Sequence, residues 1–194
     1  MGEWAESVAE VAGGLGFDNA RVVGGHSGSC VAAELAIHFP SLVASVVLDG
    51  CPLLTPQLRA TFKAMQQAVR PAPDPSGAHE SLVFRTVRTT YEHYLPGFQV
   101  TADTLETLWP AMIDYLETDF VSSAPISAEY DLESRILAIR QPLTVLTADT
   151  DTLVVTFERV CALRPDARRY RFAGHHPLHE PARAAEYAAL IDPV

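Results

Sequence analysis

The sequence predicts an α/β protein with a mostly parallel sheet, of which about four strands are recognisable, flanked by helices and interrupted by a helical insertion. Two observations predict this class. Short runs of β-branched and aliphatic residues alternate with helical stretches near both ends of the 194-residue chain. Between Leu54 and Arg140, apolar residues recur at helical spacing, as in Leu105, Leu108, Met112 and Leu116, and no strand pattern is evident.

A strand-turn-helix-strand pattern opens the chain. After a short amphipathic helix over residues 4–15, residues 20–23 (Ala-Arg-Val-Val) predict a strand that ends in a Gly-Gly turn. Residues 29–39 predict a helix that Pro40 stops, and residues 44–50 predict a second strand. Such a βαβ unit has parallel strands and a right-handed crossover.

The C-terminal part continues the pattern. Residues 142–148 and 168–172 predict two further strands, separated by a helical stretch near 157–163, and a helix over about residues 182–191 closes the chain. We therefore divide the chain into a first core part (1–54), a helical insertion (55–140) and a second core part (141–194), which together make one folded domain.

Charge and cysteine content exclude several classes of function. Lys and Arg total 14 against 24 Asp and Glu, a net charge of −10 that repels phosphate backbones and anionic membranes. Three cysteines without CxxC spacing predict neither a disulfide framework nor a zinc site. No signal peptide or membrane-spanning run is evident. We expect a cytoplasmic protein that acts on a small molecule and binds no nucleic acid, membrane, metal or organic cofactor.

The motif Gly25-His26-Ser27-Gly28-Ser29 stands where the first strand gives way to its helix. A nucleophile on a sharp strand-to-helix turn needs small residues around it, and the following helix directs N–H groups toward a developing oxyanion. Ser27 is therefore a candidate nucleophile. The structural alternative is that Ser27 is only a helix N-cap.

A serine nucleophile needs a base and an orienting acid. Asp151 follows the third predicted strand and His175 follows the fourth. Because the carboxyl ends of parallel strands meet at one sheet edge, the order Ser, Asp, His fits a site at that edge.

With these three motifs, the chain resembles the α/β-hydrolase fold family, in the group of prolyl iminopeptidases, lactone and ester hydrolases and C–C bond hydrolases. The matching segments are Gly25–Ser29 as the nucleophile elbow, Ala148–Val154 as the acid loop, and Gly174-His175 with Pro177 and Glu180 as the histidine loop. The resemblance assigns the helical middle to the variable cap of the family.

The resemblance also implies the role of each site residue. Ser27 would be the nucleophile, His175 the general base and then acid, Asp151 the orienting carboxylate, and Gly28 N–H an oxyanion donor. The family-like spacing favours Asp151 over Asp149, and Asp49, at the end of the second strand, is a third candidate acid. The expected reaction is hydrolysis of an ester, thioester, amide or related carbonyl through an acyl-enzyme.

Two departures from the family pattern set limits on this interpretation. Ser29 stands where the elbow has a second glycine, and only 26 residues precede Ser27, so the strands that open the family fold are missing. We expect the strand over residues 21–23 to form an open apolar edge that self-associates or binds a sheet-completing partner. The alternative function is a catalytically degenerate or truncated binding protein that retains the elbow by descent.

Overall fold

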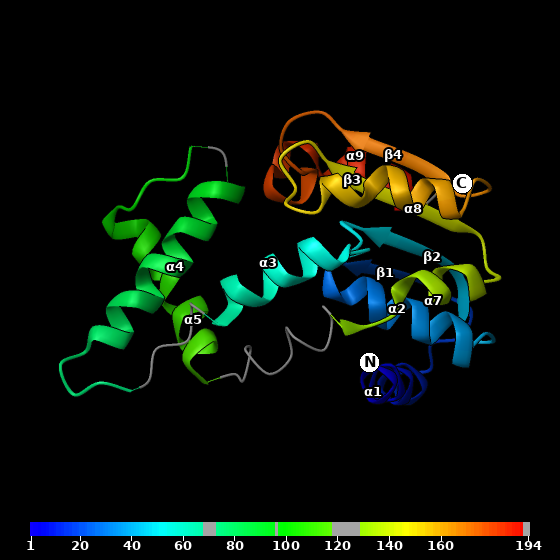
Figure 1. The fold of residues 1–194 in the computed structure, drawn as a ribbon, viewed down its shortest axis with the longest axis horizontal. Coiled ribbons are helices and arrows are strands. Elements are labelled where there is room, and N and C mark those ends of the chain that lie inside the picture. Colours follow the sequence, from blue (N-terminus) through cyan, green and yellow to red (C-terminus); the bar gives the residue numbers. More distant parts are fainter. Residues whose placement is uncertain (68–72, 96, 118–128, 192–194) are drawn as a thin grey trace. The chain divides into compact units, whose positions relative to one another are not determined.

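The computed structural model describes residues 1–67, 73–95, 97–117 and 129–191. Helices and strands alternate at both ends of the chain, and helices alone occupy the described middle (Figure 1). The elements in chain order are α1 (Gly2–Gly14), β1 (Ala20–Gly25), α2 (Ser27–His38), β2 (Val43–Asp49), α3 (Pro56–Gln67), α4 (Ala78–Tyr94), α5 (Ala102–Glu117), α7 (Leu132–Ala138), β3 (Leu143–Ala148), η1 (Val154–Thr156), α8 (Phe157–Leu163), β4 (Arg168–Phe172), η2 (Pro177–His179), η3 (Pro181–Arg183) and α9 (Ala184–Ile191).

The strands form one sheet in the order β1-β2-β3-β4, and every neighbouring pair is parallel. The predicted α/β class and parallel sheet are therefore confirmed. The register pairs Gly25 with Asp49, Asp49 with Leu146, and Ala148 with Phe172, so all four strands end at one edge. The loops that follow β1, β2, β3 and β4 meet at this carboxyl edge, which is where ligands bind in open α/β sheets.

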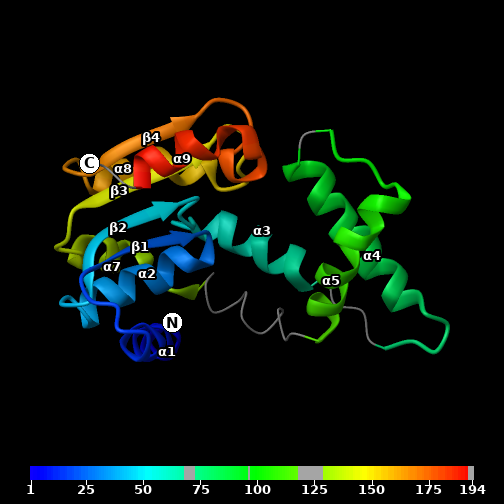
Figure 2. The same ribbon diagram turned by 180° about the vertical axis from the view of Figure 1, so that it is seen from behind.

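Helices cover both faces of the sheet. Val46, Leu48 and Val145 point to one face and pack in a cluster with residues of α2, α7 and α8. Val47 and Leu146 point to the other face and pack with Tyr187 of α9. The two opposite views show α9 on the face of the sheet opposite to α7 and α8 (Figures 1 and 2). The alternation follows from the two-residue period of a strand. All three cysteines, Cys30, Cys51 and Cys161, are buried and free.

The chain folds into two compact units. The sheet unit comprises the described residues of 1–54 and 129–194, and the helical unit comprises the described residues of 55–128. Within the helical unit, α4 packs against α5 through a small core of Val83, Val87, Leu108 and Met112. Helix α7, which the sequence places in the insertion, instead belongs to the sheet unit, where Leu132 and Ile136 are buried against α2.

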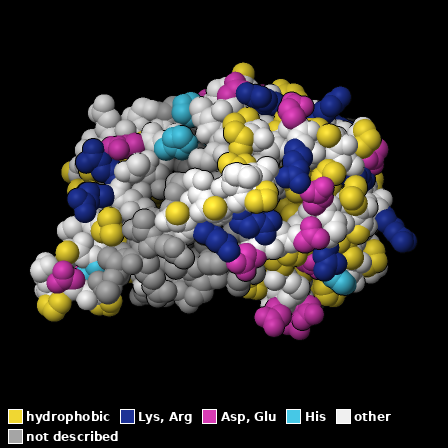
Figure 3. Space-filling model, in the orientation of Figure 1, with side chains coloured by type: hydrophobic (Ala, Val, Ile, Leu, Met, Phe, Trp, Pro, Cys, Tyr) yellow, Lys and Arg dark blue, Asp and Glu magenta, His cyan; other side chains and the backbone are white. Residues whose placement is uncertain are grey.

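Two surface features of the sheet unit bear on partners. Strand β1 is at the edge of the sheet and pairs only with β2 among the described strands. Acidic and basic side chains are interspersed on the face that Figure 3 shows, with apolar ones scattered among them. In the described part of the chain, every helix is too short or too polar to cross a membrane.

Candidate active site

The turn between β1 and α2 has one strained residue. His26 adopts φ 48° and ψ −118°, a backbone conformation that side-chain-bearing residues rarely adopt and that clusters at functional sites. Two backbone hydrogen bonds hold the turn: His26 N–H donates to the Asp49 carbonyl over 2.8 Å, and Ser29 N–H donates to the His26 carbonyl over 2.9 Å. Ser27 is exposed and is the first residue of α2.

Gly24, two residues before His26, allows the close packing beside this turn. A Cβ built on Gly24 would come within 2.3 Å of the Gly28 carbonyl oxygen and 2.8 Å of the Ala32 Cβ. Strand β1 and helix α2 therefore approach too closely for any side chain at position 24. The buried Ser29 hydroxyl donates to the Gly24 carbonyl over 2.8 Å and ties the two elements together.

The side chain at the turn contacts the acid loop. His26 Nε2 lies 2.9 Å from Asp151 Oδ2, and Leu153 N–H donates to the other oxygen, Asp151 Oδ1, over 2.6 Å. The Asp151 side chain is 6% exposed, whereas that of His26 is 46% exposed. A buried carboxylate therefore orients an imidazole that solvent reaches.

This contact shifts the pKa of both groups. The hydrogen bond with Asp151 is the main cause that raises the pKa of His26, against an opposing effect of burial, and the charges of Asp151 and Asp49 add to it. Burial alone would raise the pKa of Asp151, but the hydrogen bond and charge of His26 and the Leu153 N–H together lower it. The negative charge of Asp151 therefore stabilises the protonated form of the His26 imidazole.

Gly50 leaves room for the pair. It has φ +58°, and a Cβ there would meet His26 Cδ2 at 2.5 Å and Asp151 Oδ2 at 2.7 Å. The imidazole and the carboxylate therefore pack directly over the Gly50 backbone, where no side chain fits.

A second carboxylate at the same edge is buried. Asp49, the last residue of β2, accepts a hydrogen bond from the Tyr187 hydroxyl over 2.9 Å. His176 Nε2 lies 2.8 Å from the same oxygen, Asp49 Oδ2, although it makes no well-aligned hydrogen bond. Burial raises the pKa of Tyr187, and the charge and hydrogen bond of Asp49 raise it further.

The structure places the remaining predicted residues around this edge. His175 is half-buried, with Nδ1 3.5 Å from the Thr150 hydroxyl, and the Asp151 carboxylate is bound to His26 instead. Asp149 is exposed and accepts from Arg171 Nε over 2.6 Å and from Gly174 N–H over 3.0 Å, so it supports the histidine loop from outside. Gly28 is the second residue of α2.

Solved structures share this arrangement of sheet and helices. A hydrolase from Pseudomonas aeruginosa superimposes with a TM-score of 0.67 over 98% of this chain and 71% of its own, at 19% identity. An esterase from a Rhodococcus species gives 0.65 over 97% and 70%, at 19% identity. An α/β hydrolase enzyme from a deep-sea metagenome library gives 0.61 over 96% and 68%, at 14% identity. The chain has the α/β-hydrolase fold. No protein-family model and no curated protein matches its sequence.

The fold explains which residue occupies the elbow. In α/β hydrolases the nucleophile is on the strained strand-to-helix turn. Here that turn residue is His26, with Gly24 and Gly28 two positions away on each side, so the elbow is shifted by one residue from the expected frame centred on Ser27. The sequence contains both frames. The frame Gly25–Ser29 is centred on Ser27 and ends in a serine, whereas the frame Gly24–Gly28 is centred on His26 and has a glycine at both ends. The glycine at the second end is the sequence signal that separates the two frames.

The carboxyl edge is where ligands bind in open α/β sheets. Among the described residues, no group of three or more His, Cys, Asp or Glu side chains is arranged to hold a metal ion. The acid–base groups that lie together at this edge are His26, Asp49, Asp151, His175, His176 and His179. What they offer chemically is proton transfer beside a helix N-terminus.

Proposed function

We propose that this chain is a hydrolase of ester, thioester or amide substrates in which the His26–Asp151 pair is the general base. The observation that carries the proposal is the 2.9 Å contact between His26 Nε2 and Asp151 Oδ2, made by a half-exposed imidazole on the strained elbow turn. A positioned base of this kind contributes about 10²- to 10⁴-fold to the rate.

The chemistry follows from the tautomer. Because Nε2 faces the Asp151 carboxylate, the neutral imidazole carries its proton on Nε2, and Nδ1 has the lone pair that accepts a proton. Among the described residues, none hydrogen-bonds Nδ1. We therefore assign the first step to a water molecule that loses a proton to His26 Nδ1 as its oxygen attacks the substrate carbonyl.

The second step returns the proton. The tetrahedral oxyanion would lie at the N-terminus of α2, where Gly28 N–H is the proposed donor. When the intermediate collapses, the bond to the leaving group breaks and the leaving group takes the proton from His26 Nδ1. The products are a carboxylic acid and an alcohol, thiol or amine, and the imidazole is neutral again.

Ser27 remains the alternative nucleophile. It is exposed and directly follows His26, so its hydroxyl could attack first and form an acyl-enzyme that water then hydrolyses. In that variant of the mechanism, a fluorophosphonate would label Ser27. In the water mechanism, Ser27 is not labelled and Ser27→Ala retains activity.

The test measures hydrolysis of a panel of activated esters and thioesters by the full chain and its variants. We expect His26→Gln and Asp151→Asn each to lower kcat/KM by roughly 10²- to 10⁴-fold, whereas His93→Gln, a histidine change on α4, leaves it unchanged. Loss of activity in His175→Gln and Ser27→Ala, but not in His26→Gln, would restore the triad of Ser27, His175 and Asp151. A wild-type chain that hydrolyses none of the panel favours the non-catalytic alternative.

A further inference from the structure

Asp49 contacts two histidines at the sheet edge: His26 through its backbone carbonyl and His176 through its carboxylate. Its carbonyl oxygen accepts the His26 backbone N–H over 2.8 Å, because β1 and β2 are in register at Gly25 and Asp49. Its carboxylate, on the same residue, contacts His176 and Tyr187. The next residue is Gly50, and the His26 and Asp151 side chains pack against its backbone.

We propose that Asp49 is a positioning residue of the His26–Asp151 site: its buried carboxylate provides a second fixed negative charge behind His26 and anchors the histidine loop through His176. The activity readout of this inference rests on the proposed function. The spectroscopic readout described below does not.

The histidine loop depends on this anchor. Within the loop, Leu178 N–H donates to His176 Nδ1 over 3.2 Å, so the proton of a neutral His176 is on Nε2, the atom that faces Asp49. His176 is buried between the rings of Phe172, His179 and Tyr187. A carboxylate and a phenol that fix His176 therefore also fix the 3₁₀ turn Pro177–His179.

His176 Nε2 lies 2.8 Å from Asp49 Oδ2 without a well-aligned hydrogen bond. A buried polar atom without a good hydrogen bond is uncommon, and such atoms call for an explanation in strain or in function. Asp49 accepts its better bond from Tyr187, so its charge is only partly compensated by His176. The remaining negative charge acts on the neighbouring imidazole.

The charges around His26 fix the direction of this effect. The titratable groups that act on His26 or are acted on by it are Asp151 from the acid loop, Asp49 from β2 and His179 from the histidine loop. The charge of Asp49 raises the pKa of His26, so removing that charge lowers it. Because the base must be neutral to accept a proton, the acid limb of the activity profile moves to lower pH when Asp49 is neutralised.

The experiment records the titration of ¹⁵N-labelled histidine side chains by NMR in the full chain without substrate. We expect Asp49→Asn to lower the pKa of His26 and to shift the ¹⁵N signal of His176 Nε2, the atom that faces residue 49. The conservative variant Asp49→Glu, which keeps the charge, is expected to keep the pKa of His26 raised. Asp166→Asn is the control, because it removes an exposed charge paired with Arg164, near Thr144 and Arg168 at the opposite end of the sheet.

Each outcome decides the proposal. An unchanged His26 titration in a folded Asp49→Asn variant overturns it, as does an equal shift in Asp166→Asn. If Asp49→Asn does not fold, Tyr187→Phe replaces it. This variant removes the hydroxyl that donates to Asp49 and leaves the charge of Asp49 less compensated, so the pKa of His26 is expected to rise, and an unchanged His26 titration overturns the proposal. If the NMR shift appears but His26→Gln keeps full hydrolytic activity, Asp49 acts on His26 as proposed and the proposed function is wrong.

Discussion

His26 Nε2 and Asp151 Oδ2 lie 2.9 Å apart although 125 positions separate the two residues in the chain. Strands β1 and β3 flank β2 in the sheet, so the residues that follow them reach each other across the end of β2. The raised pKa of His26 and the lowered pKa of Asp151 make this contact a source of pH-dependent stability.

The sign of that dependence follows from the two shifts. His26, with its raised pKa, contributes stability that is complete below its ordinary pKa of 6.5 and is lost as pH rises through the folded value. Asp151, with its lowered pKa, contributes stability that is complete above 3.8 and is lost as pH falls through the folded value. Urea unfolding should therefore show the largest difference between wild type and His26→Gln between those two pH values. A difference that is the same at pH 5 and pH 9 would contradict this assignment.

The close approach of β1 and α2 predicts opposite outcomes for two adjacent glycines. Gly24→Ala places a methyl group 2.3 Å from the Gly28 carbonyl oxygen, and the backbone must move, at a cost of about 1–3 kcal/mol or more. Gly25→Ala meets no atom within 4 Å and should change the free energy of unfolding by less than about 0.5 kcal/mol. Urea unfolding of both variants tests this. Equal stability of the two would mean that β1 and α2 are farther apart than described.

The sequence predicts the sheet well because its signal is local. Each strand is a short apolar run flanked by turn residues, and every predicted strand overlaps β1, β2, β3 or β4. The carboxyl edge then follows from parallel connectivity alone. The position of β1 at the edge of the sheet also agrees with the expectation.

The site was harder to predict because its central contact is set by backbone geometry. The segment Gly24–Ser29 holds a serine frame and a histidine frame, and the choice depends on how closely β1 and α2 approach. The serine frame, Gly25–Ser29, is the one that we expected from the sequence, and it gives His26 no role in the chemistry. Likewise, spacing alone could not show that Asp49 and His176 contact each other, because that contact depends on the path of the loop after β4.

The open edge of β1 predicts self-association. Strand β1 pairs only with β2 among the described strands, and Val23 on β1 is 42% exposed. Unpaired strand edges with apolar side chains pair with other chains, and a lysine on the edge opposes such pairing. Sedimentation velocity should show mass that rises with concentration for wild type and a monomer for Val23→Lys. Val155→Lys, a like change at an exposed position in η1, should behave as wild type. A concentration-independent wild-type monomer would exclude this edge as an interface.

A buried carboxylate ties α7 to α2. The Glu34 side chain on α2 is 4% exposed and accepts from the Tyr130 hydroxyl, from Arg135 Nε over 3.1 Å and from His38 Nε2 over 2.9 Å. Burial, followed by the hydrogen bond to Glu34, raises the pKa of Tyr130, which therefore remains a donor. Because the carboxylate is buried and its partners reach it from two helices, its loss leaves several donors without an acceptor.

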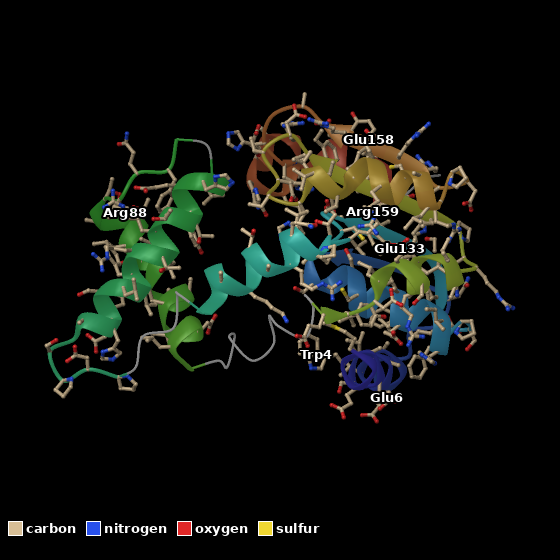
Figure 4. All side chains as sticks on the ribbon, in the orientation of Figure 1. Trp4, Glu6, Arg88, Glu133, Glu158 and Arg159 are labelled. Carbon is tan, nitrogen blue, oxygen red and sulfur yellow. The ribbon has the colours of Figure 1, made fainter. Side chains whose placement is uncertain are left out.

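We expect Glu34→Ala to lower the free energy of unfolding by about 2–3 kcal/mol, since removing one member of a buried charged network is strongly destabilising. The control is Glu133→Ala on α7, whose carboxylate pairs with Arg159 of α8 at the surface, where the two side chains point toward each other (Figure 4). Both members of that pair are exposed, and such pairs contribute about 0–1 kcal/mol. Urea unfolding followed by circular dichroism compares the two variants. If Glu133→Ala is as destabilising as Glu34→Ala, burial of the carboxylate is not what gives the Glu34 network its strength.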